Sequence, residues 1–246
     1  MKLALVGYGK MGRAVENVAM ERGHEVVARI DPTLDTHNLR AETLGGANVA
    51  IEFTVPAAAV DNITALAAAG VDAVVGTTGW HQRLDEATEA VVGAGTGLVH
   101  ASNFSLGVSL FLRLARTAAK MADALGEYDL HIREAHHRQK IDHPSGTAIT
   151  LADILIEEVA RKESWSATLP DGVPHPQVLY VASERVGDTA GSHIVGLEGP
   201  DDRIELRHEA RTRVGFARGA VTAAEWIWGR SGVFTLDDML AKTFTS

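Results

Sequence analysis

Short apolar runs alternate with amphipathic segments along the first part of the chain. The apolar runs predict strands at Lys2–Val6, Glu25–Asp31, Val49–Phe53, Val71–Val75 and Leu98–Ala101. Helical periodicity predicts helices from the first glycine-rich turn to about Arg22, and at Ala57–Ala69 and Leu84–Val92. Strands that are apolar throughout and alternate with helices are typical of a parallel sheet covered on both faces. The sequence therefore predicts an α/β, Rossmann-like, doubly wound sheet.

The alternation changes beyond residue 103. Leu106–Leu125 is predicted to form a long amphipathic helix, and its apolar stripe is formed by Leu110, Leu114, Ala118, Met121 and Leu125. An extended segment at Tyr128–Arg133 and a helix at Ala148–Lys162 follow. Alternating segments at Val178–Ser183, Ser192–Leu197 and Arg203–His208 predict an antiparallel or mixed sheet. Helical patterns return at Ala220–Gly229 and Leu236–Lys242.

These patterns predict two domains. The first is a dinucleotide-binding domain of residues 1–103, completed by a C-terminal return of residues 217–246. The second is an α+β domain of residues 104–216 that carries a mixed or antiparallel sheet.

Composition narrows the classes of function. The 246 residues include 23 Lys and Arg against 32 Asp and Glu, and the resulting net charge of −9 disfavours binding to nucleic acid. The absence of Cys excludes disulfides and a Cys nucleophile. The N-terminal apolar run is too short for a signal sequence, and no run approaches the ~20 residues of a membrane span. We therefore expect a cytoplasmic protein that does not bind nucleic acid.

A glycine-rich turn follows the first strand and begins a helix. It consists of Gly7, Tyr8, Gly9, Lys10, Met11 and Gly12. The turn and helix start can hold a pyrophosphate, and Asp31, about 20 residues further on, can accept hydrogen bonds from a ribose. The alternative is an ordinary glycine-rich turn with Asp31 as a strand cap. A P-loop is excluded, because Arg13 and Ala14 follow Gly12 instead of Lys and Ser or Thr.

Two more strand ends fit the same crevice, since ligands of open α/β sheets bind at the carboxyl ends of the strands. These ends carry Gly76, Thr77 and Thr78, and Ala101, Ser102, Asn103 and Phe104. Small residues leave room for nicotinamide and ribose, and Asn103 can hydrogen-bond a carboxamide. The alternative is that both are merely compact turns.

The segment Glu134–Ala148 is the richest in chemistry. It contains His136, His137 and Lys140, followed by a Pro-Ser-Gly-Thr turn ahead of a predicted helix. Histidine titrates near neutral pH, lysine supplies a fixed charge, and a helix start presents N–H groups to a carboxylate or phosphate. The segment therefore predicts an active site for an anion.

Neighbouring side chains on a strand point to opposite faces, so the two adjacent histidines should differ in role unless the backbone is irregular.

Two alternatives to an anion site remain for this segment. A metal site of His136, His137, Asp142 and His143 is opposed by the adjacent Arg138 and Lys140, and we expect no metal. The other alternative is a purely structural role.

These motifs together resemble one known family. The glycine fingerprint, Gly-Thr-Thr-Gly, Ser-Asn-Phe-Ser, Glu-Ala-His-His-Arg-x-Lys-x-Asp-x-Pro-Ser-Gly-Thr-Ala and a late Phe-Ala-x-Gly-Ala resemble the 4-hydroxy-tetrahydrodipicolinate (dihydrodipicolinate) reductases along the whole chain. The resemblance implies reduction of a cyclic dicarboxylate imine by NADH or NADPH, with loss of water, in diaminopimelate and lysine biosynthesis. It also implies a homotetramer assembled through the sheet of the second domain.

The resemblance assigns roles residue by residue. It implies that His136 is the proton donor and acceptor, and that Lys140 is a second proton donor. It implies substrate ligands at His137, Gly146 and Thr147, and cofactor contacts at Gly7–Gly12, Asp31, Gly76–Thr78 and Ala101–Phe104.

Two positions depart from the family pattern. Glu52 stands where the family commonly has Asp, and Pro32 stands where several members carry an Arg that grips a 2′-phosphate. With Pro32 the expected cofactor is NADH, or both cofactors.

Two other functions remain as alternatives. A two-domain reductase for a sugar or an amino-acid semialdehyde would need a different cationic motif. A non-catalytic NAD-sensing module would bind cofactor without turnover, and His136 with Lys140 argues against it.

Overall fold

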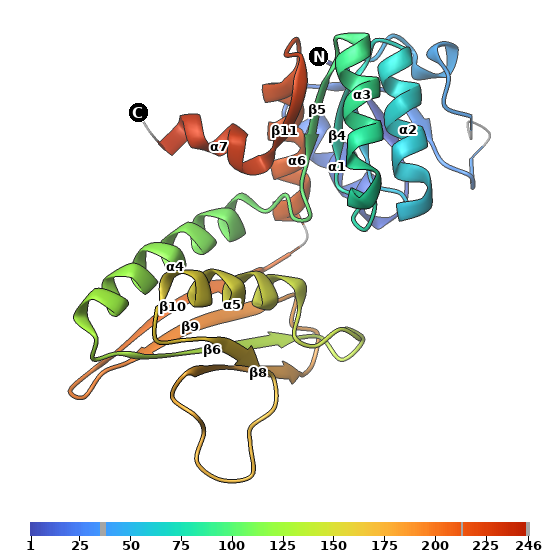
Figure 1. The fold of residues 1–246 in the computed structure, drawn as a ribbon. Coiled ribbons are helices and arrows are strands. Elements are labelled where there is room, and N and C mark those ends of the chain that lie inside the picture. The colour runs from blue at the N-terminus through green and yellow to red at the C-terminus, as the bar shows by residue number, and fades with distance from the viewer. Residues whose placement is uncertain (35–37, 213, 245–246) are drawn as a thin grey trace. The chain divides into compact units, whose positions relative to one another are not determined.

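The computed structural model describes residues 1–34, 38–212 and 214–244 (Figure 1). The chain divides into two compact units, Met1–Leu106 with Arg213–Ser246, and Gly107–Thr212. Each unit is built around its own sheet. Within the described residues, no helix combines the length and apolar character that crossing a membrane requires.

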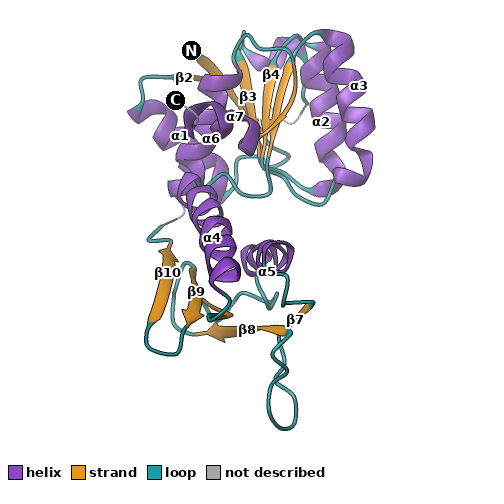
Figure 2. Ribbon diagram, turned by 60° about the vertical axis from the view of Figure 1, so that its left-hand side comes forward, coloured by secondary structure: helices purple, strands orange, loops and turns teal. Residues whose placement is uncertain are grey.

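The first unit contains a six-stranded parallel sheet in the order β11-β5-β4-β3-β1-β2. Its strands are β1 (Lys2–Val6), β2 (Glu25–Ile30), β3 (Val49–Glu52), β4 (Asp72–Val75), β5 (Gly97–His100) and β11 (Gly232–Thr235). All residues of β3, β4 and β5 are buried, because helices cover both faces (Figure 2). This arrangement confirms the predicted doubly wound sheet.

Helices on the two faces of this sheet enclose two separate cores. One core contains residues of α1 (Lys10–Glu21), α6 (Val214–Ile227) and α7 (Leu236–Phe244). The other contains residues of α2 (Pro56–Ala68) and α3 (Leu84–Ala94). Successive residues of β1 alternate between the cores, as the pleat of a strand requires. Two short 3₁₀ helices, η1 (Ala41–Leu44) and η2 (His81–Arg83), complete the unit.

The second unit contains a five-stranded sheet in the order β10-β9-β6-β8-β7. Its elements are α4 (Leu106–Leu125), β6 (Asp129–His136), α5 (Gly146–Glu158), β7 (Ser164–Ser166), β8 (Val178–Arg185), β9 (Ser192–Glu198) and β10 (Arg203–Glu209). The central strand β6 is parallel to β8 and antiparallel to β9, which confirms a mixed sheet. The helices α4 and α5 pack on one face of it (Figure 2).

The buried stripe of α4 differs from the predicted one. The predicted stripe is wrong, because Leu110, Leu114, Met121 and Leu125 are all exposed. The buried stripe instead consists of Val108, Phe111, Ala115, Ala119 and Ala122. Its three alanines have small side chains, which allow the helix backbone to lie close to the sheet. This close approach, rather than the size of the apolar side chains, decides which face of the helix is buried.

Four elements differ from the sequence prediction. Strands β7 and β11 were not predicted, because three or four residues are too few to establish an alternation. Helix α6 begins at Val214, ahead of the predicted start at Ala220. Helix α5 begins at Gly146 and ends at Glu158, so the buried Lys162 lies beyond it.

Candidate active site

The glycine loop fits tightly against its own unit. Gly7 has a φ of +89°, and its N–H donates to the Ile30 carbonyl at 2.8 Å. A Cβ at Gly7 would lie 2.0 Å from the Phe53 carbonyl oxygen, and one at Gly12 would lie 2.3 Å from the Gly7 oxygen. Real atoms do not approach so closely, so both positions require glycine.

The start of α1 fits a nicotinamide dinucleotide. Gly9 is the N-cap residue, no side chain caps the helix, and a Cβ on Gly9 would meet nothing within 4 Å. Lys10 and Met11 form the first turn, which carries no acidic residue. Uncapped N–H groups beneath open space, with the positive end of the helix dipole, are what a pyrophosphate requires.

Asp31 lies beside this loop and is held as a carboxylate. Its Oδ2 accepts the Tyr8 N–H at 2.7 Å, and its Oδ1 accepts the Thr33 N–H at 2.9 Å and the Thr33 hydroxyl at 2.6 Å. Hydrogen bonds from Thr33, then from Tyr8, lower the pKa of Asp31. An ionised carboxylate at this strand end can accept hydrogen bonds from ribose hydroxyls.

The sheet register brings the remaining predicted cofactor residues to the same edge. Val6 pairs with Ile30 and Glu52, Glu52 pairs with Val75, and Val75 pairs with His100. The residues that follow these positions therefore emerge together, and they include Gly7–Gly12, Asp31, Gly76–Thr78 and Ala101–Phe104.

Local contacts hold two of these strand ends in place. The Thr77 hydroxyl accepts the Thr54 N–H at 2.7 Å, whereas Thr78 is exposed. Asn103 Oδ1 accepts the Ser105 N–H at 2.8 Å, which fixes the turn that contains Ala101, Ser102 and Phe104.

Glu52 lies beneath this edge as a fully buried carboxyl group. It accepts hydrogen bonds from the Thr54 hydroxyl and, at 3.2 Å, from Asn62 Nδ2. Burial raises the pKa of Glu52. Both hydrogen bonds reach Oε1, whereas Oε2 is buried without a hydrogen-bond partner.

In the second unit, His136 ends β6 on the buried face of the sheet, next to Glu134. Its Nδ1 forms a hydrogen bond with the Glu134 carboxylate, and Arg185 Nη1 lies 2.9 Å from Glu134 Oε1. Burial raises the pKa of Glu134, but hydrogen bonds from His136, Ser183 and Arg185 outweigh it and lower that pKa to about 2. An ionised Glu134 fixes the proton on His136 Nδ1, so Nε2 is the nitrogen left for proton transfer.

A glycine lies beside His136 Nε2. A Cβ on Gly191 would lie 3.0 Å from this nitrogen. Gly191 has a φ of +156°, a backbone conformation that other residues rarely adopt. Glycine therefore leaves space beside the atom that would exchange the proton.

A second histidine, His193, completes the buried cluster, and sequence reasoning missed it. Its ring centroid lies 5.1 Å from that of His136, and its Nε2 lies 3.0 Å from Ser145 Oγ. Burial, then the nearby His136, lower the pKa of His193 to about 4, so this ring is neutral near pH 7. The available signal was the alternation in β9, which puts His193 on the face of Val195 and Leu197.

The loop after β6 carries Lys140. Its Nζ donates to the two oxygens of Asp142 at 2.8 and 2.9 Å. Arg185 reaches the same loop, since its Nε and Nη2 donate to the Lys140 and Asp142 carbonyls at 3.2 and 2.5 Å. One guanidinium thus joins the carboxylate behind His136 to the segment that positions Lys140.

The start of α5 adds an anion-binding element to this unit. Ser145 is the N-cap residue, and its hydroxyl accepts the Ala148 N–H at 3.3 Å. Gly146 and Thr147 open the helix, with Gly146 exposed and Thr147 half-buried. His137 leaves the strand at its end, which gives the irregular backbone that adjacent histidines need to serve one ligand.

The residues that could bind a metal in the structure differ from those that the sequence indicated. Among the described residues, the group with metal-ligand geometry is Glu134, His136 and His193, within 4.8 Å of one another, and it lacks His137, Asp142 and His143. Arg185 beside Glu134 opposes a second cation there. The hydrogen-bonded contacts favour proton transfer as the chemistry of this cluster.

A Rossmann-like unit and a second unit with a carboxylate-held histidine, a lysine and a helix start define a two-domain nicotinamide-dependent oxidoreductase. The chain matches the family models described as dihydrodipicolinate reductase, N-terminus, over residues 1–104 and dihydrodipicolinate reductase, C-terminus, over residues 107–240. The chain therefore belongs to the dihydrodipicolinate reductase family, as its motifs predict.

Individual relatives agree with this assignment. The chain is 38% identical over 244 residues to the 4-hydroxy-tetrahydrodipicolinate reductase of Christiangramia forsetii, covering 99% of both chains. It is 40% identical over 198 residues to the same-named enzyme of Methanococcoides burtonii, covering 79% of this chain and 73% of the relative.

Solved structures share the fold. A dipicolinate-bound dihydrodipicolinate reductase from Paenisporosarcina sp. TG-14 matches with a TM-score of 0.77 at 23% identity, over 96% of this chain and 97% of that one. A probable dehydrogenase from Thermotoga maritima matches with a TM-score of 0.57 at 11% identity, over 97% of this chain and 92% of that one. At these identities the likeness concerns the fold alone.

Proposed function

We propose that this protein reduces 4-hydroxy-tetrahydrodipicolinate to tetrahydrodipicolinate with NADH or NADPH, releasing water, in diaminopimelate and lysine biosynthesis. The observation that carries the proposal is His136, whose Nδ1 is held by an ionised Glu134 beside Lys140 and the start of α5. This combination supplies a proton donor and binding groups for a dicarboxylate.

The first unit serves as the cofactor domain in this proposal. Gly7–Gly12 and the start of α1 hold the pyrophosphate, and Asp31 accepts the ribose hydroxyls. Gly76–Thr78 and Ala101–Phe104 contact the nicotinamide half. When bound, the reduced cofactor supplies a hydride to the substrate ring. With Asp31 followed by Pro32, NADH is used at least as well as NADPH, and a preference for NADPH of more than about tenfold in kcat/KM would contradict this.

The second unit serves as the substrate domain. The substrate first loses its 4-hydroxyl group and a proton from the neighbouring carbon as water, which gives a conjugated ring imine. Hydride addition to this imine leaves an electron-rich enamine, which must be protonated at the neighbouring carbon. His136 Nε2 donates that proton while Glu134 stabilises the imidazolium. Lys140 holds a carboxylate and acts as a second proton donor. His137, the Gly146 N–H group and the Thr147 hydroxyl bind the substrate carboxylates.

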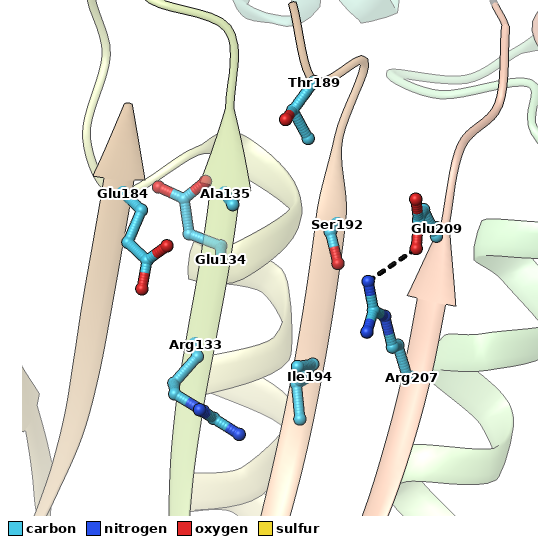
Figure 3. A pocket seen from close by; sticks show the side chains of 9 residues that line it. All are labelled: Arg133, Glu134, Ala135, Glu184, Thr189, Ser192, Ile194, Arg207 and Glu209. Carbon is cyan, nitrogen blue, oxygen red and sulfur yellow. Dashed lines mark hydrogen bonds and ion pairs between the residues drawn. The ribbon is translucent and has the colours of Figure 1, made fainter. Parts of the chain in front are cut away.

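The same proposal includes a homotetramer formed through the sheet of the second unit, in the cytoplasm. Among the described helices, α4 and α5 pack on one face of this sheet. A cavity of about 250 Å³ lies in the sheet itself. It is lined by both cations and anions, among them Arg133, Glu184, Arg207 and Glu209 (Figure 3). Charges of both signs suit self-complementary pairing with a second copy. Sedimentation velocity tests the tetramer, and a monomer at micromolar concentration would contradict it.

One assay tests the activity. Freshly generated 4-hydroxy-tetrahydrodipicolinate is added to enzyme and NADH, and oxidation is followed by absorbance. Cofactor-only and amino-acid semialdehyde reactions are the controls. Oxidation that depends on the dicarboxylate is expected. Oxidation with the semialdehyde alone would favour the other class of two-domain reductase, and cofactor binding without turnover would favour a sensing module.

A further inference from the structure

His193 links the two parts of the substrate site. It is 4% exposed, it lies opposite Glu134 in the register of β9 with β6, and its ring meets the His136 ring edge to face. It also contacts Ser145, the N-cap residue of α5, which is 2% exposed. A polar side chain so well buried requires a hydrogen-bond partner, and the proton transfer and carboxylate binding proposed above do not use this one.

The hydrogen bond between Ser145 and His193 has a defined direction. The Ser145 oxygen accepts the Ala148 N–H at 3.3 Å, so its single hydroxyl proton is left to donate elsewhere. His193 Nε2 lies 3.0 Å from that oxygen. Burial, then His136, lower the pKa of His193 to about 4, so the ring is neutral near pH 7 and can accept the proton. Among the described residues this is the ring's one hydrogen bond, since Nδ1 is buried without a partner.

This direction decides which groups of α5 are left for a ligand. The first N–H groups of a helix have no helical acceptor, and a serine N-cap satisfies one of them. Here Ser145 accepts the N–H of Ala148, the third residue of the helix, and leaves the Gly146 N–H and the Thr147 side chain for a carboxylate. A buried hydroxyl that lost its acceptor would turn toward another one, which weakens the cap and loosens the first turn.

We propose that His193 is a positioning residue for the substrate, because it accepts the Ser145 hydroxyl proton and so holds the start of α5 in the orientation that binds a carboxylate. The inference rests on the proposed function. His193 acts through Ser145 and touches neither substrate nor cofactor. Its effect should therefore appear in the affinity for dicarboxylates and not in the proton transfer by His136.

His193→Phe is the test, because phenylalanine keeps a ring against His136 but cannot accept a proton. The KM for substrate and the Kd for pyridine-2,6-dicarboxylate, a planar analogue, should each rise about fivefold to tenfold, as the loss of one buried hydrogen bond provides. The kcat and the Kd for NADH should change by less than about twofold.

His208→Phe is the matched control. His208 pairs with His193 in the register of β10 with β9, and its ring stacks on Phe111 of α4. The substitution removes an imidazole from the neighbouring strand and leaves the hydrogen bond to Ser145 in place. It should keep the KM and both Kd values within about twofold of the parent.

Rescue separates this role from a merely structural one. His193→Gln replaces the acceptor nitrogen by an amide oxygen of similar reach, so its KM should lie within about twofold of the parent. A KM as high in His193→Gln as in His193→Phe would overturn the inference. An unchanged KM in a folded His193→Phe would overturn it as well.

The donor of the hydrogen bond gives an independent measurement. Ser145→Ala should raise the KM at least as much as His193→Phe, and the double variant should raise it no further, because the two residues act as a unit. Additive effects would overturn the coupling. If His193→Phe does not fold, an unchanged KM in Ser145→Ala overturns the inference. A parent protein that does not bind pyridine-2,6-dicarboxylate would overturn the proposed function instead.

Discussion

The two units build their sites from different materials. The cofactor unit uses backbone, because Gly7 and Gly12 leave no room for a Cβ and the start of α1 presents bare N–H groups. The substrate unit uses side chains from three strands, since Glu134 contacts His136 and Arg185, and His136 contacts His193. The cofactor site therefore depends on the shape of the backbone, and the substrate site depends on the charges of its side chains. We expect substitutions in the two sites to affect binding and catalysis differently.

The largest expected effect comes from the substrate unit. His136→Ala should lower kcat by roughly 10²–10³, since it removes the proton donor, and should leave the Kd for NADH unchanged. Stopped-flow and steady-state kinetics measure both quantities. His143→Ala, an exposed histidine of the same segment, is the control and also tests the metal alternative. An effect on KM alone would remove His136 from proton transfer.

A pH prediction concerns His193, whose pKa is lowered to about 4 from an ordinary 6.5. The unfolded chain takes up this proton more readily, so stability should fall as pH drops from about 6.5 to about 4 and level off below that. The loss is about 3 kcal/mol for a fully buried ring. Denaturant unfolding of His193→Gln should show a weaker pH dependence than the parent, while the exposed-site control His175→Gln should match the parent.

The backbone site is tested by Gly12→Ala. The new Cβ would displace the Gly7 carbonyl, at a cost of about 1–3 kcal/mol, so the Kd for NADH should rise about tenfold to a hundredfold. Binding of pyridine-2,6-dicarboxylate to the second unit should not change. Gly93→Ala, on α3, where an added Cβ would meet nothing within 4 Å, controls for loss of a glycine. An equal loss of affinity for NADH and for pyridine-2,6-dicarboxylate would mean that the substitution does not act on the cofactor unit alone.

Lys140→Ala should weaken pyridine-2,6-dicarboxylate about tenfold and also lower kcat, because one cation serves binding and proton donation. Competitive inhibition constants measure the change. Arg138→Ala removes an exposed cation two residues away and should have little effect. Equal inhibition of parent and Lys140→Ala would remove this lysine from the site.

The smallest effects are expected at the other substrate ligands. His137→Ala and Thr147→Val should each raise the KM for substrate a few-fold with kcat and NADH affinity nearly unchanged, because each removes uniform binding. Thr150→Val, one turn further along α5, is the control for Thr147. A loss of NADH affinity in either variant would assign the residue to the cofactor instead.

The difference between a backbone site and a side-chain site also decides how much of each site the sequence predicts. Gly7, Gly12 and Asp31 lie close in sequence or at fixed strand ends, so spacing alone predicts their meeting. His193 meets Glu134 only because β9 pairs with β6 in one register, and Arg185 meets His136 only through the register of β8. Such registers depend on tertiary packing, which a single sequence does not reveal.

The return of the chain to its first sheet has a consequence during synthesis. Helices α6 and α7 provide Ala220, Ile227, Leu236 and Met239 to the core around β1, and β11 extends that sheet beside β5. The inserted unit, Gly107–Thr212, is complete before any of these residues leaves the ribosome. A nascent chain therefore finishes its second unit first, while one face of the earlier strands is covered by α1 alone until the last residues emerge.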